Sequence, residues 1–249
     1  MYSFLLIGQS NMAGRGNPED DPFIKNDRVH ILINGRWQKA FFPINRDRHT
    51  SGINLSESFA DLFAREHDAD VGLIPCADGG TNLKQWSPGD LLYDNAINNA
   101  RLAMRTSTLA GILWHQGEGD CREHFYPLYE EKLNNFIKSI RKDLNAENVP
   151  FLMGGLGDFL KDCPISDYLV NYVHINKALK TVAEKNHMTG FVSAEGLTSN
   201  SDLLHFDAKS LHTFGERYYR VYKSLEDKIK LVDAPASEET TKRTSMELL

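Results

Sequence analysis

Ser10 is the first candidate for chemistry, because it follows an apolar run directly and has small residues around it. The run, residues 4–7, has the composition of a buried strand, and the segment GQSNMAG at residues 8–14 comes next. A serine at the turn from a strand into a helix can present its hydroxyl beside free backbone N–H groups, where an oxyanion would be stabilised. Serine is also a common helix N-cap, so Ser10 by itself leaves both interpretations open.

Asp202 and His205 supply the two residue types that a nucleophilic serine requires. A base must accept the proton of the serine, and a carboxylate orients that base and stabilises its charge. Three positions apart in a turn, Asp202 can hold Nδ1 of His205 and leave Nε2 free. The pair also suits a helix-start aspartate beside a half-exposed histidine. Ser10 and His205 can meet only if loops from the two ends of the chain converge.

Two further segments could stabilise the negative charge of an acyl-transfer intermediate. Gly79 and Gly80 follow the apolar run 71–75, and a glycine lets a backbone N–H approach a substrate closely. Gln116 follows the run 111–114, and its side-chain amide is a second candidate donor beside the N–H of Ser10. Each feature alone also suits an ordinary turn or a buried amide. Together, at strand ends, they favour a serine hydrolase.

Other chemistries lack necessary residues. The segment GGLG at residues 154–157 resembles the start of a dinucleotide fingerprint, but Leu160 stands where the third glycine is required. Neither GxxxxGK[ST] nor HExxH occurs, and Cys76, Cys121 and Cys163 lack zinc-type spacing. Cys76 and Cys121 fall near strand ends, yet a buried structural role is the simpler interpretation. We therefore expect no metal and no cofactor.

Short apolar runs alternate with segments of helical periodicity along the chain. The runs are residues 4–7, 71–75, 111–114, 151–153 and 190–192. The helical segments are residues 56–66, 91–105, 126–144, 168–185 and 208–223. This alternation predicts an α/β fold, a three-layer α/β/α sandwich with a mostly parallel central sheet. Ligands bind beyond the carboxyl ends of such strands, which is where the candidate residues lie.

The segment 29–38 interrupts the alternation. Two short runs flank Asn34-Gly35, which suits a type I′ turn, so we predict a small β-hairpin insertion that decorates the surface. No linker rich in proline or glycine occurs in mid-chain, which predicts one domain over residues 1–232. Residues 233–249 are rich in Ser, Thr, Glu and Lys and are predicted to form a flexible tail.

Composition excludes several classes of protein. With 249 residues, 41% of them hydrophobic, the chain can bury a sizeable core. Its 28 Lys and Arg against 34 Asp and Glu give a net charge of −6, which disfavours phosphate-backbone binding. No apolar run approaches the roughly 18 residues of a membrane span. The cysteines are few and their number is odd, which suits a reducing compartment better than a set of disulfides. We expect a cytoplasmic protein that binds neither nucleic acid nor membrane; its oligomeric state is left open.

The four polar segments together resemble the conserved blocks of SGNH hydrolases. In order, they are residues 8–14 (GQSNMAG), 79–82 (GGTN), 114–118 (WHQGE) and 202–206 (DLLHF). More narrowly they are similar to the branch that contains sialate O-acetylesterases and the acetylxylan esterases of carbohydrate esterase family 6. The similarity extends from residue 3 to about residue 222. It implies a flavodoxin-like α/β/α sandwich without metal, and removal of O-acetyl groups from sugars.

The resemblance also implies roles by position. Ser10 matches the nucleophile, His205 the general base and Asp202 its carboxylate partner. The oxyanion donors would be the N–H of Ser10, the N–H of Gly80, with Gly79 as the alternative, and the side chain of Gln116. The substrate-binding residues would be Gln9, Asn11, Asn82 and Glu118.

The expected partner is an acetylated carbohydrate, such as an acetylated xylan- or mannan-type oligosaccharide. Arg15, Arg46 and Arg48 could hold a sugar carboxylate, and a sialate O-acetylesterase is therefore the first alternative. A catalytically silent carbohydrate-binding protein on the same fold is the second, since fold does not imply function.

Overall fold

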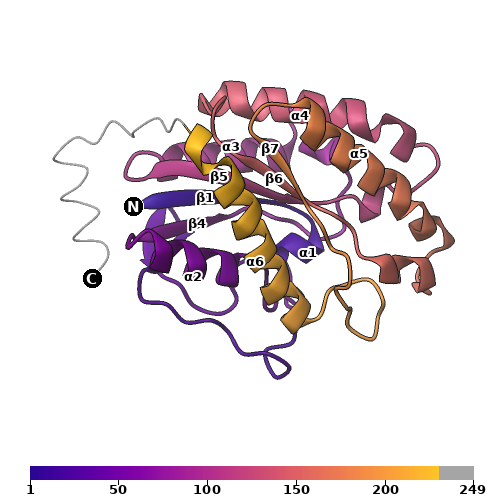
Figure 1. Cartoon of the computed structure of the whole chain (residues 1–249), viewed down its shortest axis with the longest axis horizontal. Coiled ribbons are helices and arrows are strands. Elements are labelled where there is room, and N and C mark those ends of the chain that lie inside the picture. Colours follow the sequence, from indigo (N-terminus) through magenta and orange to yellow (C-terminus); the bar gives the residue numbers. More distant parts are fainter. Residues whose placement is uncertain (230–249) are drawn as a thin grey trace.

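A seven-stranded sheet forms the centre of the computed structural model, which describes residues 1–229 (Figure 1). The strand order is β3-β2-β4-β1-β5-β6-β7. Every neighbouring pair is parallel except β2 and β3, which are antiparallel. The strands are β1 Tyr2–Gly8, β2 Val29–Ile33, β3 Arg36–Lys39, β4 Val71–Pro75, β5 Thr108–His115, β6 Phe151–Gly154 and β7 Thr189–Val192.

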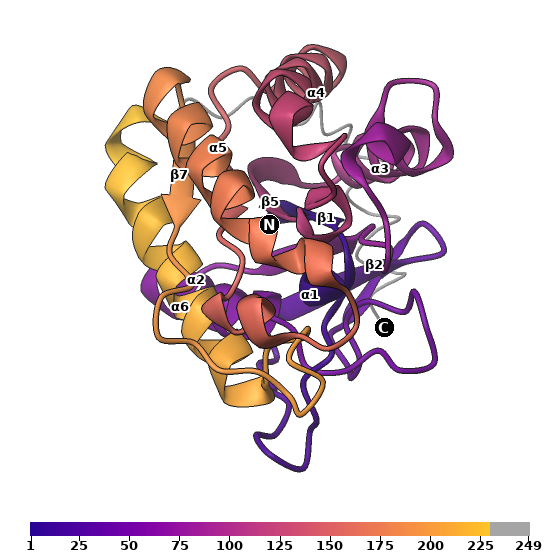
Figure 2. The same cartoon turned by 90° about the vertical axis from the view of Figure 1, so that its right-hand side faces the viewer.

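Helices cover both faces of this sheet, which confirms the predicted three-layer α/β/α architecture. Figure 2 shows α3 and α4 along one side of the sheet and α2 and α6 along the other. Along β1, Leu5 and Ile7 belong to the core under α3, α4 and α5, whereas Phe4 and Leu6 belong to the core under α2 and α6. The strands are therefore apolar on both faces. The long helices are α2 Ser56–Glu66, α3 Leu91–Ala103, α4 Tyr129–Leu144, α5 Tyr172–Lys185 and α6 Ala208–Leu225.

The helix predicted over residues 126–144 begins three residues later than expected. Its buried side chains Leu133, Phe136, Ile137 and Ile140 recur at the spacing of one helical face, as predicted. Residues 126–128 instead form a separate 3₁₀ turn that contains a proline, a residue that cannot donate a backbone hydrogen bond. The helix ends at Leu144, and its C-cap Asn145 has a φ of 50°, in the left-handed region.

The predicted hairpin exists, but it is not a surface decoration. Asn34 and Gly35 both have positive φ, 50° and 75°, as a type I′ turn requires. β2 then pairs in parallel with β4, with Val29 opposite Val71, so the hairpin widens the central sheet. The first four residues of β2 are buried, which is the physical reason: an apolar strand of this kind must be covered on both faces.

The chain reverses its direction across the sheet at β1, which lies between β4 and β5. Such a switch point leaves a crevice beyond the carboxyl ends of the strands, because the connections leave in opposite directions. Gly8, Pro75 and His115 end the three central strands. The short helix α1, Ser10–Ala13, begins in this crevice directly after β1.

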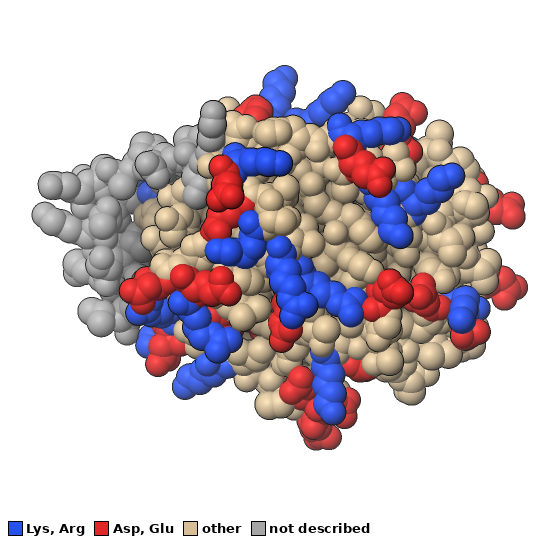
Figure 3. Space-filling view, in the orientation of Figure 1, with Lys and Arg blue, Asp and Glu red and all other residues tan. Residues whose placement is uncertain are grey.

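Two further observations concern the whole described chain. None of the helices within residues 1–229 combines the length and apolar character needed to cross a membrane. On the face seen in Figure 3, basic and acidic side chains of the described residues are interspersed. The structure describes neither the predicted tail, residues 233–249, nor residues 230–232 of the predicted domain. The tail and the end of the domain therefore stay predictions.

A buried histidine joins α6 to α2 and to the segment that follows α1. Nδ1 of His212 lies 2.9 Å from Oδ2 of Asp21, and its Nε2 lies 3.3 Å from Oε2 of Glu57. Glu57 also accepts the backbone N–H groups of Asn54 and Ile24. Burial lowers the pKa of His212, but its bonds to the two carboxylates outweigh burial and raise that pKa overall. Burial raises the pKa of Glu57, because it disfavours the charged carboxylate.

Stability should therefore depend on pH through His212. A histidine whose folded pKa is raised stabilises the fold fully below its unfolded pKa of about 6.5, and this contribution is lost as pH rises through the folded pKa. We predict that His212→Gln lowers the free energy of unfolding more near pH 6 than near pH 9. Urea unfolding of both proteins at the two pH values measures this difference. An equal loss at both pH values would contradict the prediction.

Candidate active site

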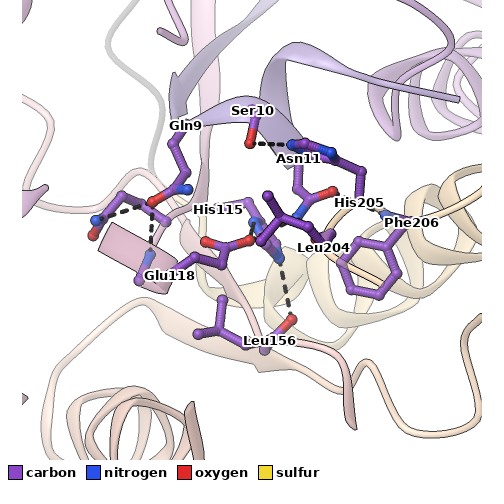
Figure 4. Close-up of polar contacts among 12 residues, drawn as sticks. Gln9, Ser10, Asn11, His115, Glu118, Leu156, Leu204, His205 and Phe206 are labelled. Carbon is purple, nitrogen blue, oxygen red and sulfur yellow. Dashed lines mark hydrogen bonds and ion pairs between the residues drawn. The ribbon is translucent and has the colours of Figure 1, made fainter. Parts of the chain in front are cut away.

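Ser10, His205 and Asp202 form a continuous chain of hydrogen bonds at the carboxyl edge of the sheet. Nε2 of His205 lies 3.0 Å from Oγ of Ser10, and Nδ1 lies 2.6 Å from Oδ2 of Asp202. Ser10 begins α1, whereas the other two residues lie in the loop before α6, near the opposite end of the described chain. Figure 4 shows the bond between Ser10 and His205. The predicted convergence of these residues is present in the structure.

The loop that carries Asp202 and His205 holds its own conformation. Oδ1 of Asp202 accepts the N–H groups of Leu204 at 2.9 Å and His205 at 3.0 Å. Burial raises the pKa of Asp202, but these two N–H groups and the His205 ring outweigh it and lower that pKa overall. Because the ionised carboxylate can only accept, Nδ1 of His205 carries a proton and Nε2 is free to accept one from Ser10.

Asn11 ties this loop to the start of α1. Its Oδ1 accepts the N–H of Phe206 at 3.1 Å, and its Nδ2 donates to the carbonyl of Leu204 at 3.3 Å and to Oε1 of Glu118 at 2.6 Å. Both neighbours of His205 in the chain are therefore held by the residue that follows Ser10. Asn11 was predicted to bind substrate, but it is 1% exposed and does not line the cavity, so that prediction is wrong.

Glu118 extends the same network. It is 4% exposed, its Oε1 accepts from Asn11, and its Oε2 has no hydrogen-bond partner among residues 1–229. Nδ1 of His115 lies 3.9 Å from Oε1 of Glu118. Burial lowers the pKa of His115, which favours the neutral ring. Glu118 also lines the cavity described below, as expected of a residue near the substrate.

The two glycines after β4 have different roles in the structure. The N–H of Gly79 donates to Oδ2 of Asp47 at 2.8 Å, and Arg15 pairs with the same oxygen at 2.7 Å. The N–H of Gly80 has no acceptor within the described chain, and Gly80 lines the cavity beside Ser10 with a φ of 76°. Gly80, the expected donor, is therefore the one of the two that remains free to bind an oxyanion.

Gln116 lies elsewhere than predicted. It is fully buried, and its Nε2 donates to Oδ2 of Asp120 at 2.6 Å and to the carbonyl of Thr81 at 3.1 Å. Its Oε1 accepts from the hydroxyl of Tyr129. Oε1 of Gln9 is a third acceptor, 3.3 Å from Nε2 of Gln116, so both amide protons are used inside the protein. The structure does not bring Gln116 to the cavity, and the prediction that it donates to an oxyanion is wrong in this geometry.

A cavity of about 430 Å³ opens above Ser10 and His205. A volume of this size is typical of small-ligand sites. Three of the four predicted substrate-binding residues line it, namely Gln9, Asn82 and Glu118. Arg48 comes from the segment 17–50 and Ile165 from the segment 158–167, and Arg15 follows α1. The rest of its wall is formed by Gly79, Gly80, Gly119, Arg122, Phe125, Tyr168, Leu169 and Leu204.

The cysteines do not offer an alternative nucleophile. Cys76, Cys121 and Cys163 are buried and unpaired, and none lines this cavity. Burial raises the pKa of Cys76 to about 12, and it raises the pKa of Cys121 further. A thiol in such surroundings stays protonated and is a poor nucleophile, so the structural interpretation of these two cysteines is favoured.

Two carboxylates in the site were missed from the sequence. Asp47 holds Gly79, and burial raises its pKa while the Arg15 guanidinium and further hydrogen bonds lower it overall. Asp120 holds Gln116 and also accepts the N–H of Leu83 at 2.7 Å. Asp120 lies in the recognisable segment after β5 and could have been noticed there. Asp47 comes from a loop with no motif, and only the folded chain brings it to Gly79.

The three-layer α/β/α sandwich, with Ser10, His205 and Asp202 together at its switch point, is consistent with an SGNH-type carbohydrate esterase. The family model described as carbohydrate esterase, sialic acid-specific acetylesterase, matches residues 1–224 of the chain. The chain belongs to this family. It is therefore a carboxylic ester hydrolase that acts on acetylated carbohydrates, as expected; the narrower assignment to carbohydrate esterase family 6 stays a prediction.

Similar proteins agree with this assignment. The probable carbohydrate esterase At4g34215 of Arabidopsis thaliana is 28% identical over 218 residues, which cover 75% of this chain and 83% of that protein. The X-ray structure of AT4G34215 covers 90% of this chain and 98% of its own, with a TM-score of 0.78 and 26% identity. The crystal structure of NanS, at 14% identity, covers 91% and 97% with a TM-score of 0.71 and shows the same fold.

The contacts of Asn11 predict its effect on stability. We expect Asn11→Ala to lower the free energy of unfolding by about 2 kcal/mol or more, because the buried N–H of Phe206 and Oε1 of Glu118 lose their partner. Urea denaturation measures this value. Asn98→Ala, at an exposed position of α3, is the matched control and should change it by less than about 0.5 kcal/mol. Similar values for both variants would show that Asn11 does not hold the loop.

Proposed function

We propose that the chain hydrolyses acetyl esters of carbohydrate hydroxyls through an acetyl-serine intermediate. The observation that carries this proposal is the hydrogen-bond chain from Asp202 through His205 to Ser10 at the floor of the cavity. The free N–H groups supply the second requirement of acyl transfer, donors aimed at the developing oxyanion. The N–H of Ser10 has no acceptor within α1, because Ser10 is the first residue of that helix. The N–H of Gly80 has no acceptor within the described chain.

The proposed reaction has two steps. Nε2 of His205 accepts the hydroxyl proton as Oγ of Ser10 bonds to the acetyl carbon, and the carbonyl electron pair moves onto oxygen. When the tetrahedral intermediate collapses, the ester bond breaks and the sugar oxygen takes the proton from His205. Water, deprotonated by the same nitrogen, then attacks the acetyl group on Ser10. This second attack releases acetate and restores the serine hydroxyl.

We propose a neutral acetylated sugar, of xylan or mannan type, as substrate. The arginines that were expected near the mouth already have partners. Arg15 pairs with Asp47 at 2.7 Å and Arg48 with Asp78 at 2.7 Å. Arg46 lies over the ring of Phe41, 4.2 Å from its centroid. The charge of Arg15 and of Arg48 is thus already balanced by a carboxylate of the protein, which weakens the attraction of either residue for a sugar carboxylate.

One observation favours a sialate O-acetylesterase as the second candidate. Arg122 lines the cavity and lies over the ring of Tyr168, 4.9 Å from its centroid. It takes part in none of the ion pairs found within residues 1–229. Its guanidinium could therefore receive the carboxylate of a sialic acid. The family's description as sialic acid-specific also supports this candidate.

The triad proposal predicts a graded loss of rate. Ser10→Ala and His205→Ala should each lower kcat on an acetyl ester by about 10³-fold or more, because the members of a triad act as a unit. Asp202→Asn should cost less, because loss of the triad aspartate is less severe than loss of the nucleophile or of the base. Steady-state kinetics of the four proteins measure the series. Near-full activity in His205→Ala would contradict the assignment of the base.

Acyl and sugar selectivity provide a separate prediction. We expect 4-nitrophenyl acetate to be hydrolysed faster than longer acyl esters, and Ser10→Ala to abolish the difference. Acetylated xylo- and manno-oligosaccharides should then be cleaved faster than O-acetylated sialic acid. Faster cleavage of the sialic acid, lost in Arg122→Ala but kept in the exposed-site control Arg105→Ala, would instead establish the second candidate. No activity above Ser10→Ala on any of these esters would favour the silent carbohydrate-binding alternative.

A further inference from the structure

A second cavity, of about 340 Å³, lies beyond the carboxyl ends of β2 and β4. Its wall is formed by residues 32–34, 44–48 and 75–78 and by the start of α3. Residues 32–34 are the end of β2 and the first residue of its turn, so this cavity depends on the pairing of the hairpin with β4. The volume lies within the usual range for a small-ligand site.

Arg48 connects this second cavity to the one above Ser10, since it lines both. Its guanidinium pairs with Asp78 at 2.7 Å and donates to the carbonyl of Gly79 at 3.1 Å. Asp78 lines the second cavity, and Gly79, the next residue in the chain, lines the first. The two cavities therefore adjoin at Arg48, and a ligand of extended shape can occupy both.

Buried polar contacts fix the segment 44–48, which forms one side of the second cavity. Oδ1 of Asn45 accepts the N–H of Ala77 at 3.2 Å, and its Nδ2 donates to the carbonyl of the same residue at 3.0 Å. Asp47 accepts the N–H of Gly79 at 2.8 Å. The side chains of Asn45 and Asp47 are both almost fully buried. This wall is thus ordered without a ligand, which reduces the entropy that binding must cost.

The composition of the lining suits a ligand without charge. Four charged residues line the second cavity, two of each sign: Arg46, Asp47, Arg48 and Asp78. Both aspartates are already paired with arginines, as described above. Much of the remaining lining is apolar and includes Ile33, Ile44 and Leu92. Such a surface can pack against the C–H groups of a sugar ring and gives no preference for an anion or a cation.

Two exposed asparagines add hydrogen-bonding groups to this lining. Oδ1 of Asn95 accepts from Nδ2 of Asn99 at 3.0 Å, and Nδ2 of Asn95 donates to no acceptor within residues 1–229. The side chain of Asn34 forms no hydrogen bond within the same residues. A hydroxyl both donates and accepts, so the hydroxyls of a sugar can pair with either amide.

We infer that the second cavity is a subsite for a neighbouring sugar of the glycan whose acetyl group reaches Ser10. This inference rests on the proposed function. The acetylated sugar occupies the cavity above Ser10, the glycan passes Arg48, and the next sugar packs on the apolar lining while its hydroxyls bond to Asn34 and Asn95. The preferred substrate is therefore an acetylated oligosaccharide or polysaccharide and not an acetylated monosaccharide.

The dependence of activity on chain length tests this subsite. From O-acetylated xylose to O-acetylated xylotetraose, and likewise from mannose to mannotetraose, kcat/KM should rise by about tenfold or more, because contacts in the second cavity form only with the longer substrate. Release of acetate measures both rates. Equal values of kcat/KM for the short and long substrates would overturn the subsite.

Asn95→Trp places a large side chain in the second cavity. Because Asn95 is exposed on α3, the substitution leaves the core intact, and it should remove most of the gain with chain length. Hydrolysis of 4-nitrophenyl acetate, which is too small to reach this cavity, should stay within about twofold of wild type, since no reacting group is changed. Asn98→Trp, exposed on the same helix and outside the cavity, is the matched control and should keep the gain. Asn95→Leu, which removes the amide with little change in volume, should lower kcat/KM on the tetrasaccharides by about threefold or more.

The outcomes separate the subsite from the proposed function. A gain with chain length that is lost in Asn95→Trp and kept in Asn98→Trp supports the subsite. A gain that survives in Asn95→Trp would show that the longer glycan binds elsewhere, and would overturn the subsite while leaving the Ser10-dependent reaction intact. If the wild-type protein hydrolyses none of these esters faster than Ser10→Ala, the proposed function fails and the subsite fails with it.

Discussion

The hydrogen bonds of Asn11 are the contacts on which the rest of the site depends. They hold the backbone of Leu204 and Phe206, on both sides of His205, against the start of α1. Ser10 is the immediate neighbour of Asn11, so the same contacts set the distance of 3.0 Å between Oγ of Ser10 and Nε2 of His205. A single hydrogen bond contributes little to stability on its own. The neighbouring buried polar network, which would be costly to leave unpaired, holds Ser10 and His205 in place.

The sheet determines where such a network can form. β1 lies between β4 and β5, and the loops that leave these three strands meet in one crevice. Loops carry many polar backbone groups, and in this crevice buried side chains satisfy them. Asp47 accepts the N–H of Gly79, and Asp120 accepts that of Leu83. The loops therefore interlock through carboxylates, whereas the N–H of Gly80, which lines the cavity beside Ser10, has no acceptor within the described chain.

Gln9 and Gln116 illustrate how neighbours decide the role of identical side chains. Both follow a central strand and both are almost fully buried. The amide of Gln116 is captured by Asp120, so its protons are used within the protein. The amide of Gln9 meets three donors, which orient its oxygen inward and leave its nitrogen to the cavity. Each glutamine directly follows a central strand, so the sequence around it does not distinguish their roles. The orientation of each amide is instead set by the donors and acceptors that other segments bring to it.

Short-range patterns in the sequence were enough to predict the architecture and the candidate catalytic residues: apolar runs alternate with helical periodicity, a serine follows a strand, and an aspartate stands three residues before a histidine. The sequence also indicated the hairpin turn, whose two left-handed residues are Asn34 and Gly35. The folded chain was needed to show that the hairpin joins the central sheet, that loops from both ends of the chain bring Ser10 and His205 together, and that Gln9 rather than Gln116 lines the cavity. These arrangements depend on contacts between segments that are far apart in the chain. Local sequence patterns contain no information about such contacts.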